Sequence, residues 1–195
     1  MNRRCFVFAG LLGGCAKPPK VEEDNLLPDF GQLPEFSFVD QQRRPFARGD
    51  LAGKVWILDL IYTRCTAVCP RMSAVMKDVQ KRLESERRAG LLSISVDPEY
   101  DTPERLAAFA GKYGADPERW RFLHGPKARV REVQVKTQRH LDPEEITAHS
   151  KQFYLVDGNG YVRGVYSVTQ PGAVDDMIGD LRRLLEKPDK PEPST

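Results

Sequence analysis

The sequence predicts an α/β fold, with a central mixed sheet covered by helices on both faces and a β-hairpin at the N-terminal end. Two observations carry this prediction. Apolar runs typical of buried strands alternate with segments whose apolar residues recur every three or four positions, as on one face of a helix. Near the C-terminal end, two strand-like runs flank Asp157-Gly158-Asn159-Gly160, which favours an antiparallel hairpin. Elements in this order are typical of a three-layer sandwich.

The length and composition fit one domain with its own hydrophobic core. The chain has 195 residues, of which 40% are hydrophobic, so disulfide bonds are not needed to hold the fold. The formal net charge is only +2, and acidic residues are interspersed among the basic ones. We therefore expect no nucleic-acid binding, and we expect a monomer.

The first residues have the features of an export signal. A basic segment, residues 1–4, precedes a short apolar run from Cys5 to Leu12 that cannot span a bilayer. Leu12-Gly13-Gly14-Cys15 then resembles the lipobox of bacterial lipoproteins, in which the chain is cut before a cysteine that carries lipid. An ordinary signal peptide with a chance cysteine is the alternative. Arg3-Arg4 also faintly resembles a twin-arginine export signal.

These features divide the chain into four parts. We expect residues 1–14 to be a lipoprotein-type signal peptide and residues 15–27 to be a flexible tether that starts at a lipidated Cys15. Loss of the signal lowers the formal net charge from +2 to 0, because it removes two arginines. Residues 28–186 form the folded domain, and residues 187–195 a disordered tail. The domain is expected at the extracytoplasmic face of the bacterial cell envelope, anchored to the membrane by lipid.

The domain begins with a predicted hairpin. Glu35 to Asp40 alternates polar and apolar residues, as a half-buried strand does. Gln41 to Arg44 is a turn, and Pro45-Phe46 begins a short return strand. A second turn at Asp50 to Gly53 leads into the sheet.

A fully buried strand and a helix follow. Val55 to Tyr62 is apolar on both faces apart from Asp59, which predicts a strand in the middle of the sheet. A helix is predicted from Met72 to Arg87, because apolar residues recur there at three- and four-residue spacing. Met72 and Met76 could be soft metal ligands, but we expect them to belong to the apolar face of this helix.

The remaining elements alternate between strand and helix. Thr102 is expected to cap a helix that has Pro103 at its first position and an apolar face ending at Tyr113. The other predicted helices are Pro126–Val135 and Val174–Leu185, and the predicted strands are Leu91–Val96, Trp120–Leu123, Lys151–Val156 and Tyr161–Ser167.

Cys65 and Cys69 lie at the turn between the first buried strand and the first helix. A cysteine pair at this place in an α/β protein is typical of a thioredoxin-like arrangement. Proline disfavours a helical conformation of the residue before it, so we expect Cys69 to cap the helix and Pro70 to be its first residue. The positive end of the helix dipole favours thiolates, and Arg64 and Arg71 would add to this effect if they point inward.

Three residues separate the cysteines, whereas dithiol oxidoreductases of the thioredoxin type have two. The longer loop can close a disulfide and also leaves room for a metal ion, for which two thiolates are an incomplete site. His149 is our candidate third ligand, because it precedes a strand whose leading loop lies beside the dithiol turn in a thioredoxin-like sheet. A surface-loop role is its alternative. We expect His124 to be structural or a neighbour of the site, and His140 to be exposed.

Three motifs in order resemble those of the SCO/SenC (PrrC) family. They are Asp59 to Pro70, which contains Cys-Thr-Ala-Val-Cys-Pro, then Ser95 to Pro103, and then Ala148-His149-Ser150 followed by Phe153 to Asp157. The resemblance extends from about Phe30 to Leu185. It favours His149 over the other histidines as the third ligand.

The resemblance implies a thioredoxin-like domain that binds copper through Cys65, Cys69 and His149. It implies a role in assembling the dinuclear copper site of cytochrome c oxidase, by delivering copper, by reducing the cysteines of that site, or both. The implied partners are the copper-site subunit of the oxidase and other copper chaperones. The chain departs from many relatives at Tyr62-Thr63-Arg64, where Arg64 adds a positive charge beside the site.

The ligand set that the resemblance implies suits copper. Two thiolates and one imidazole form a three-coordinate site for Cu(I), and Cu(II) fits when a further ligand joins. Zn²⁺ is the competing metal, because a Cys₂His set with an open position also suits zinc. A disulfide between Cys65 and Cys69 would remove both sulfur ligands, so copper loading depends on the thiol state.

Five further residues are candidate neighbours of the site, namely Tyr62, Pro70, Arg71, Asp97 and Asp101. We expect the two aspartates to form the turn and the helix cap around Pro98 and Thr102. The alternative is that their carboxylates tune the copper loop or meet a partner.

Two enzymatic functions compete with copper binding. A thiol-disulfide oxidoreductase would use Cys65 as the more exposed thiol, without metal and with little need of His149. A peroxidase of the same fold would depend on a single cysteine.

Overall fold

Strand β3 (Val55–Ile61) is the middle strand of the structure, a computed structural model that describes residues 27–138 and 151–186. All its side chains are buried, as expected for a strand covered on both faces. The other elements are β1 (Ser37–Val39), β2 (Pro45–Ala47), the 3-10 helix η1 (Arg48–Leu51), α1 (Val68–Arg82), β4 (Ala89–Ser95), α2 (Pro103–Tyr113), β5 (Trp120–Leu123), α3 (Lys127–Thr137), β6 (Gln152–Val156), β7 (Val162–Ser167) and α4 (Ala173–Glu186).

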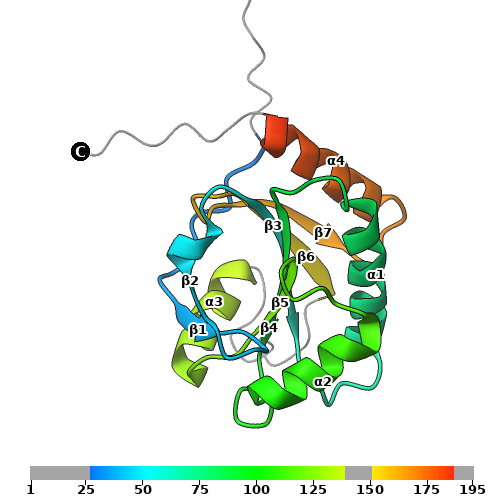
Figure 1. The fold of residues 1–195 in the computed structure, drawn as a ribbon. Coiled ribbons are helices and arrows are strands. Elements are labelled where there is room, and N and C mark those ends of the chain that lie inside the picture. Colours follow the sequence, from blue (N-terminus) through cyan, green and yellow to red (C-terminus); the bar gives the residue numbers. More distant parts are fainter. Residues whose placement is uncertain (1–26, 139–150, 187–195) are drawn as a thin grey trace, which may run out of the picture.

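The main sheet has the strand order β5-β4-β3-β6-β7 (Figure 1). Strands β3, β4 and β5 are parallel, whereas β6 is antiparallel to both β3 and β7, so the sheet is mixed. The carboxyl ends of the three parallel strands therefore meet at the same end of the sheet, and the loops that follow them lie together. The hairpin strands β1 and β2 form a separate antiparallel pair.

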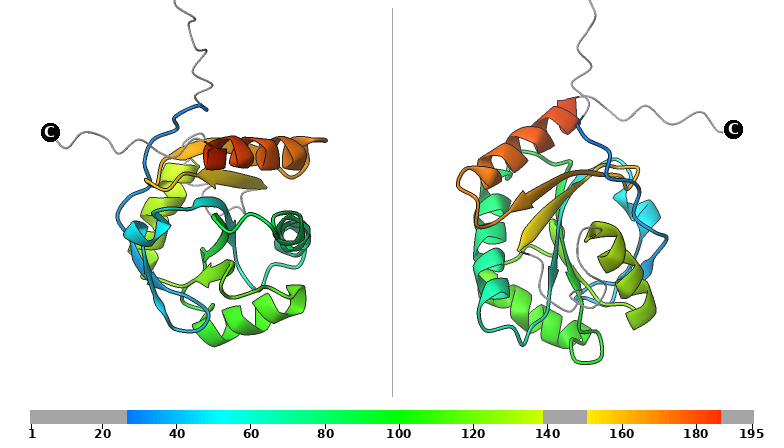
Figure 2. Two further views of the ribbon diagram at one scale, coloured as in Figure 1. Left: turned by 45° about the horizontal axis from the view of Figure 1, so that its top comes forward. Right: turned by 180° about the vertical axis from the view of Figure 1, so that it is seen from behind.

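Helices cover both faces of the main sheet (Figures 1 and 2). Val55, Ile57 and Ile61 of β3 pack on the face covered by α1, α2 and α4. The alternating Trp56 and Leu58 pack on the other face, with α3 and the β1–β2 hairpin. This arrangement confirms the predicted three-layer α/β fold with a mixed sheet and an N-terminal hairpin. Among residues 27–138 and 151–186, no helix is long and apolar enough to cross a bilayer.

Helix α1 differs from its prediction at both ends. It begins at Val68 instead of Met72, because a proline is tolerated in the first turn of a helix, where its missing N–H loses no intrahelical partner. Cys69 therefore lies inside the first turn rather than at the cap. The helix ends at Arg82, earlier than predicted, and residues 83–88 form the loop that leads to β4.

The outer edge of β5 is closed by the end of β1 and the residues that follow it. Val39 and His124 exchange both backbone hydrogen bonds, with N···O distances of 2.9 and 2.8 Å. Nε2 of Gln41 donates to the Trp120 carbonyl (3.0 Å), and Oε1 of Gln41 accepts from the Phe122 N–H (2.8 Å). Because an open strand edge invites pairing with other chains, these contacts protect β5 and fix the hairpin beside the loop after it.

We expect Gly90→Ala to lower the free energy of unfolding by about 1–3 kcal/mol in urea denaturation, because it overpacks the core. Gly90 lies in β4 opposite Trp56, and a Cβ at position 90 would lie 2.3 Å from two ring carbons of Trp56. The ring cannot move aside freely, because it is buried and its Nε1 donates to the Leu51 carbonyl at 3.0 Å.

The matched control is Gly179→Ala in α4, where a new Cβ meets nothing within 4 Å. It should leave the free energy of unfolding unchanged or raise it by up to about 1 kcal/mol, because alanine is the better helix former. Equal effects of the two substitutions would contradict the packing of Trp56 against Gly90.

Candidate functional site

The two thiols lie at the carboxyl end of β3. Cys65 is in the turn between β3 and α1, Cys69 is in the first turn of α1, and no disulfide joins them. Cys65 has 7% of its surface exposed and Cys69 has 0%. The backbone N–H of Cys69 donates to Cys65 Sγ at 3.3 Å. The structure thus brings together the two cysteines that the sequence singles out, and only Cys65 reaches solvent.

The surroundings of Cys65 favour its thiolate. Burial acts to raise the pKa of Cys65, but hydrogen bonds from the backbone of Cys69, Ala67 and Val68, together with one from the Cys69 side chain, outweigh it, so the pKa is lowered. These N–H groups belong to the start of α1, whose N-cap residue, Ala67, supplies no side-chain acceptor. The Cys65 sulfur therefore accepts from the helix start, as a serine or aspartate side chain does at an ordinary N-cap.

Cys69 has the opposite surroundings. Burial is the main cause that raises the pKa of Cys69 to about 12. The Cys65 side chain and the Asp59 carboxylate act in the same direction, against a backbone hydrogen bond from Tyr62. At neutral pH the Cys69 thiol therefore keeps its proton, and Cys65 is the better nucleophile.

Arg64 does not carry this asymmetry, because its guanidinium is engaged elsewhere. Nε of Arg64 donates to Asp97 Oδ2 at 2.9 Å, and the guanidinium lies 4.4 Å from the centroid of the Tyr100 ring. Arg71 is exposed on α1. The lowered pKa of Cys65 therefore depends on the backbone amides of α1 rather than on the two arginines that the sequence suggested.

Asp101 fixes the residues that precede Cys65. Its carboxylate is fully buried and accepts hydrogen bonds from the Thr63 N–H (3.0 Å), from Thr63 Oγ1 (2.5 Å) and from Ser95 Oγ (2.6 Å). Its backbone carbonyl lies 2.8 Å from His124 Nδ1. One residue therefore joins the loops that follow β3, β4 and β5.

Asp97 and Asp101 also form the expected turn. The Asp101 N–H donates to the Asp97 carbonyl at 2.8 Å, and Thr102 Oγ1 caps α2 by accepting from the Arg105 N–H at 3.4 Å. The side chains of the two aspartates do more than this, because they bind the residues immediately before Cys65. The expected turn and cap are confirmed, and a role of the carboxylates in tuning a copper loop or meeting a partner stays a prediction.

Two tyrosines flank the thiols. Burial and the two cysteine sulfurs raise the pKa of Tyr62, whose side chain hydrogen-bonds that of Cys65. Burial and the same sulfurs also raise the pKa of Tyr113, the last residue of α2. The sequence placed Tyr113 only on the apolar face of its helix. Pro70 is half-buried in the first turn of α1.

A buried carboxylate that the sequence did not single out lies on the α1 face of the sheet. Asp59 of β3 is 0% exposed, and its Oδ1 accepts from Ser93 Oγ at 2.6 Å. Ser93 Oγ in turn accepts from Trp120 Nε1 at 2.9 Å. Asp59 Oδ2 has no hydrogen-bond partner among the described residues, and burial raises the pKa of Asp59 to about 7.

A sequence signal for this carboxylate existed. Asp59 is the one charged residue of an apolar strand, and strand alternation places it on the same face as Ile57 and Ile61. That face is the one against which Cys69 packs. The partner Ser93 follows only from the strand register, which the sequence does not state.

Three of the predicted residues lie outside the described ranges: His149, His140 and the lipidation candidate Cys15. Among residues 27–138 and 151–186, no three His, Cys, Asp or Glu side chains are grouped so that they could hold a metal ion. The ligand role of His149 therefore stays a prediction. Met72 and Met76 are both fully buried in the core, as expected for the apolar face of α1.

Comparison with known proteins gives a family. The family model described as SCO1/SenC matches residues 28–186. A relative from Stutzerimonas stutzeri, named as a candidate copper-binding protein, is 34% identical over 169 residues, covering 83% of this chain and 80% of that protein.

Solved structures agree with this match. A Bacillus anthracis protein described as a SCO1/SenC family lipoprotein is 38% identical, with a TM-score of 0.69, and the match covers 78% of this chain and 94% of that one. BsSco, described as a Sco-family cytochrome c oxidase assembly protein with a disulfide switch, is 32% identical, with a TM-score of 0.72 and coverage of 83% and 97%. The thioredoxin-like fold predicted from the sequence is confirmed.

Cys65 should react with iodoacetamide at least about ten times faster than Cys69 at pH 7, because its pKa is lowered and that of Cys69 is about 12. Mass spectrometry of peptides after short exposures measures both rates. Cys69→Ser is the control, because it keeps the backbone N–H that contacts Cys65. In this variant Cys65 should still react at pH values below the ordinary pKa of a thiol. Faster modification of Cys69 would contradict the asymmetry.

Between about pH 4 and pH 7, the titration of Asp59 should lower the free energy of unfolding of the wild type as pH rises. Asp59→Asn should not show this decrease. A carboxyl whose folded-state pKa is raised to about 7 stabilises the fold fully only below its unfolded value, and the stabilisation is lost as pH rises through the folded value. The free energy of unfolding of the variant minus that of the wild type should therefore increase by at most about 4 kcal/mol from about pH 4 to pH 7.

Urea denaturation at a series of pH values measures this difference. Asp78→Asn is the control, because the Asp78 side chain is 63% exposed and lies 3.9 Å from Arg82. Parallel pH profiles for the wild type and Asp59→Asn would show that Asp59 titrates normally in the folded protein.

Proposed function

The chain belongs to the SCO1/SenC family, and from this premise we propose that it binds copper outside the cytoplasm and helps to assemble the dinuclear copper site of cytochrome c oxidase. The relative from Stutzerimonas stutzeri supports copper binding by its name. The description of BsSco supports a role in assembly of the oxidase.

The observation that carries the proposal is the pair of sulfurs at the start of α1. The Cys69 N–H lies 3.3 Å from Cys65 Sγ, and the Cys65 thiolate is favoured by backbone amides. Two soft sulfur donors held on one turn suit Cu(I), and with His149 they make the proposed three-coordinate site. Cys69 loses its proton to solvent when it joins the metal, so loading depends on pH. Zn²⁺ is the competitor that the same donors could accept.

The copper is cargo in this proposal, and the protein holds it for transfer. A site with three ligands leaves an open position at which an acceptor ligand can attach before the protein's own ligands leave. Of the two sulfur donors, Cys65 is the one that reaches solvent. Delivery to the copper-site subunit of the oxidase, with loading by other copper chaperones, is the order of events that we propose.

The location belongs to the same proposal. A signal peptide at residues 1–14 and lipid on Cys15 would hold the domain at the extracytoplasmic face of the membrane. The relative from Bacillus anthracis that is described as a lipoprotein supports this anchor.

A second candidate function is favoured by the difference between the two thiols. Cys65, with its lowered pKa, would attack a disulfide of the partner and form a mixed disulfide. Cys69 would then attack Cys65, lose its proton and release the second partner sulfur as a thiol. The partner gains two electrons and the protein ends with a Cys65–Cys69 disulfide. In this reaction the protein prepares the cysteines of the oxidase copper site rather than filling it.

Copper binding is tested by titrating the reduced protein with Cu(I) against a competing chelator. We expect one copper per chain, with affinity lowered by at least about a hundredfold in Cys65→Ala, Cys69→Ala and His149→Ala, because each substitution removes a ligand. His140→Ala is the matched control and should bind as the wild type does. Unchanged affinity in His149→Ala would remove that residue from the site.

The same proteins separate the two functions. Reduction of an oxidised dithiol peptide should need both cysteines, tolerate His149→Ala and proceed with a copper chelator present if the second function is the main one. If the wild type binds copper but does not reduce the peptide, the second function is rejected and copper delivery is the one that remains.

A further inference from the structure

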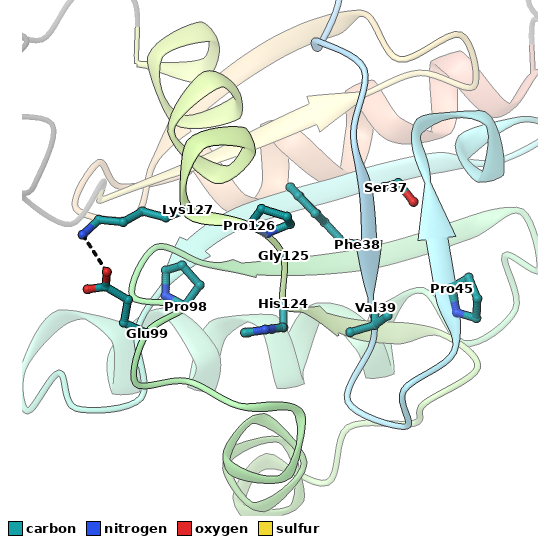
Figure 3. Close-up of a pocket in the computed structure, with 10 residues that line it drawn as sticks. All are labelled: Ser37, Phe38, Val39, Pro45, Pro98, Glu99, His124, Gly125, Pro126 and Lys127. Atoms are coloured by element: carbon teal, nitrogen blue, oxygen red, sulfur yellow. Dashed lines mark hydrogen bonds and ion pairs between the residues drawn. The ribbon is translucent and has the colours of Figure 1, made fainter.

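Two neighbouring pockets form one groove beside the dithiol. The first, of about 590 Å³, lies between the β1–β2 hairpin and the loops that follow β4 and β5 (Figure 3). The second, of about 750 Å³, lies between α3 and the loop that follows β4. Pro98, Glu99 and Lys127 line both pockets, so the two pockets adjoin at these residues. We call the combined space the groove.

The walls of the first pocket are largely apolar. Figure 3 shows Pro126 near the Phe38 side chain, with Pro98 beside Glu99 on one side and Pro45 at the far end. The backbone at Gly125 backs directly onto Phe38, because a Cβ there would lie 1.9 Å from a ring carbon of Phe38. The wall is therefore built by close packing of the hairpin against the loop after β5, rather than by mobile surface side chains.

The second pocket is lined by residues that contact the dithiol turn. Tyr62, whose side chain hydrogen-bonds that of Cys65, and Asp97, which pairs with Arg64, line this end. The groove thus runs from the hairpin to Tyr62, a neighbour of Cys65, along the carboxyl ends of the parallel strands. Ligands of α/β proteins commonly bind at that end of a sheet.

The charges along the groove balance. Its charged lining residues, two acidic and two basic, are Asp97, Glu99, Lys127 and Arg131. Glu99 Oε1 and Lys127 Nζ are 3.1 Å apart, as the dashed line in Figure 3 marks, and both side chains are exposed. A strongly charged ligand gains little from such a lining, whereas an uncharged apolar one gains from burial.

We propose that the groove binds an extended, uncharged and largely apolar segment of the partner protein that presents its thiols to Cys65. The inference rests on the proposed function, which supplies a partner that must approach this sulfur. An extended segment fits because the two pockets adjoin and together run from the hairpin to Tyr62, whose side chain contacts that of Cys65. Binding there would hold the partner's sulfur beside Cys65 and so favour transfer by proximity.

A partner in the groove also packs against the residues that position the dithiol loop. His124 lines the first pocket, and its Nδ1 contacts the Asp101 carbonyl at 2.8 Å. The Asp101 carboxylate holds Thr63, two residues before Cys65. Contacts made in the groove are therefore connected to the turn that carries the nucleophile.

Ala128→Trp tests the groove without changing the dithiol. Ala128 is an exposed residue of α3 that lines the second pocket, so an indole there fills the space. Ser37→Trp does the same at the far end, in the first pocket. Ala108→Trp, on the exposed surface of α2 and outside both linings, is the matched control.

The probe is the reduced, metal-free, soluble copper-site domain of cytochrome c oxidase, titrated into the reduced, metal-free protein by calorimetry. A synthetic peptide with the two-cysteine segment of that domain is the second probe. We expect both groove variants to raise Kd for both probes by at least about tenfold, and Ala108→Trp to change it less than about twofold. Circular dichroism shows that the three variants fold alike.

Unchanged Kd in both groove variants overturns the proposal, and so does the absence of binding to the wild type at millimolar concentration. A wild-type dimer that Ala128→Trp dissociates would assign the groove to a second copy and overturn it too. If Ala128→Trp changed the NMR signals of His149 in the absence of any partner, the groove would be assigned to this chain's own residues, and the proposal would be overturned. The docking titration uses no copper, so the two proposals can fail separately. If the protein did not bind Cu(I) but still bound both probes, the proposed function would be rejected and the docking groove would be retained.

Discussion

The amide groups at the start of α1 need an acceptor, and the Cys65 sulfur supplies it. Ala67 caps the helix without a side-chain acceptor, and the N–H of Cys69 donates to Cys65 Sγ at 3.3 Å. An anionic sulfur satisfies these amides and the positive end of the helix dipole together. Metal binding, disulfide formation and alkylation each change the Cys65 sulfur, which is the acceptor of these amide hydrogen bonds. The chemistry of the dithiol and the stability of the first turn of α1 are therefore coupled.

Two fully buried aspartates near the thiols differ in how they are satisfied. The Asp101 carboxylate accepts three hydrogen bonds, from Thr63 and Ser95, and so fixes the turn before Cys65. Asp59 accepts one, from Ser93, and its other oxygen has no partner among the described residues. A buried charge is tolerated when donors replace its lost water, and is costly when they do not. The first carboxylate therefore serves geometry, and the second keeps a neutral form available near neutral pH.

The fold followed from the sequence because its signals are local. The apolar β3 segment, the spacing of apolar residues in α1 and the Asp-Gly-Asn-Gly turn each need only neighbouring residues. The cause of the lowered pKa of Cys65 could not be predicted, because the sequence does not show that the Arg64 side chain hydrogen-bonds to Asp97. Proximity of Tyr113 to the sulfurs depends on how α2 packs, and the partner of Asp59 depends on strand register. Long-range placement, rather than residue type, is what the sequence left open.

The three parallel strands explain why the dithiol and the groove lie at the same end of the sheet. Loops after β3, β4 and β5 share one end of the sheet, and they carry the dithiol turn, the turn from Asp97 to Asp101, and His124. Asp101 hydrogen-bonds to the other two, so the three loops cannot move independently. A change in the loop that lines the groove would therefore reach the turn before Cys65 through the hydrogen bonds of Asp101, even if it touched no ligand. In the docking that we propose, binding of a partner and the reactivity of Cys65 are therefore constrained by the same few hydrogen bonds.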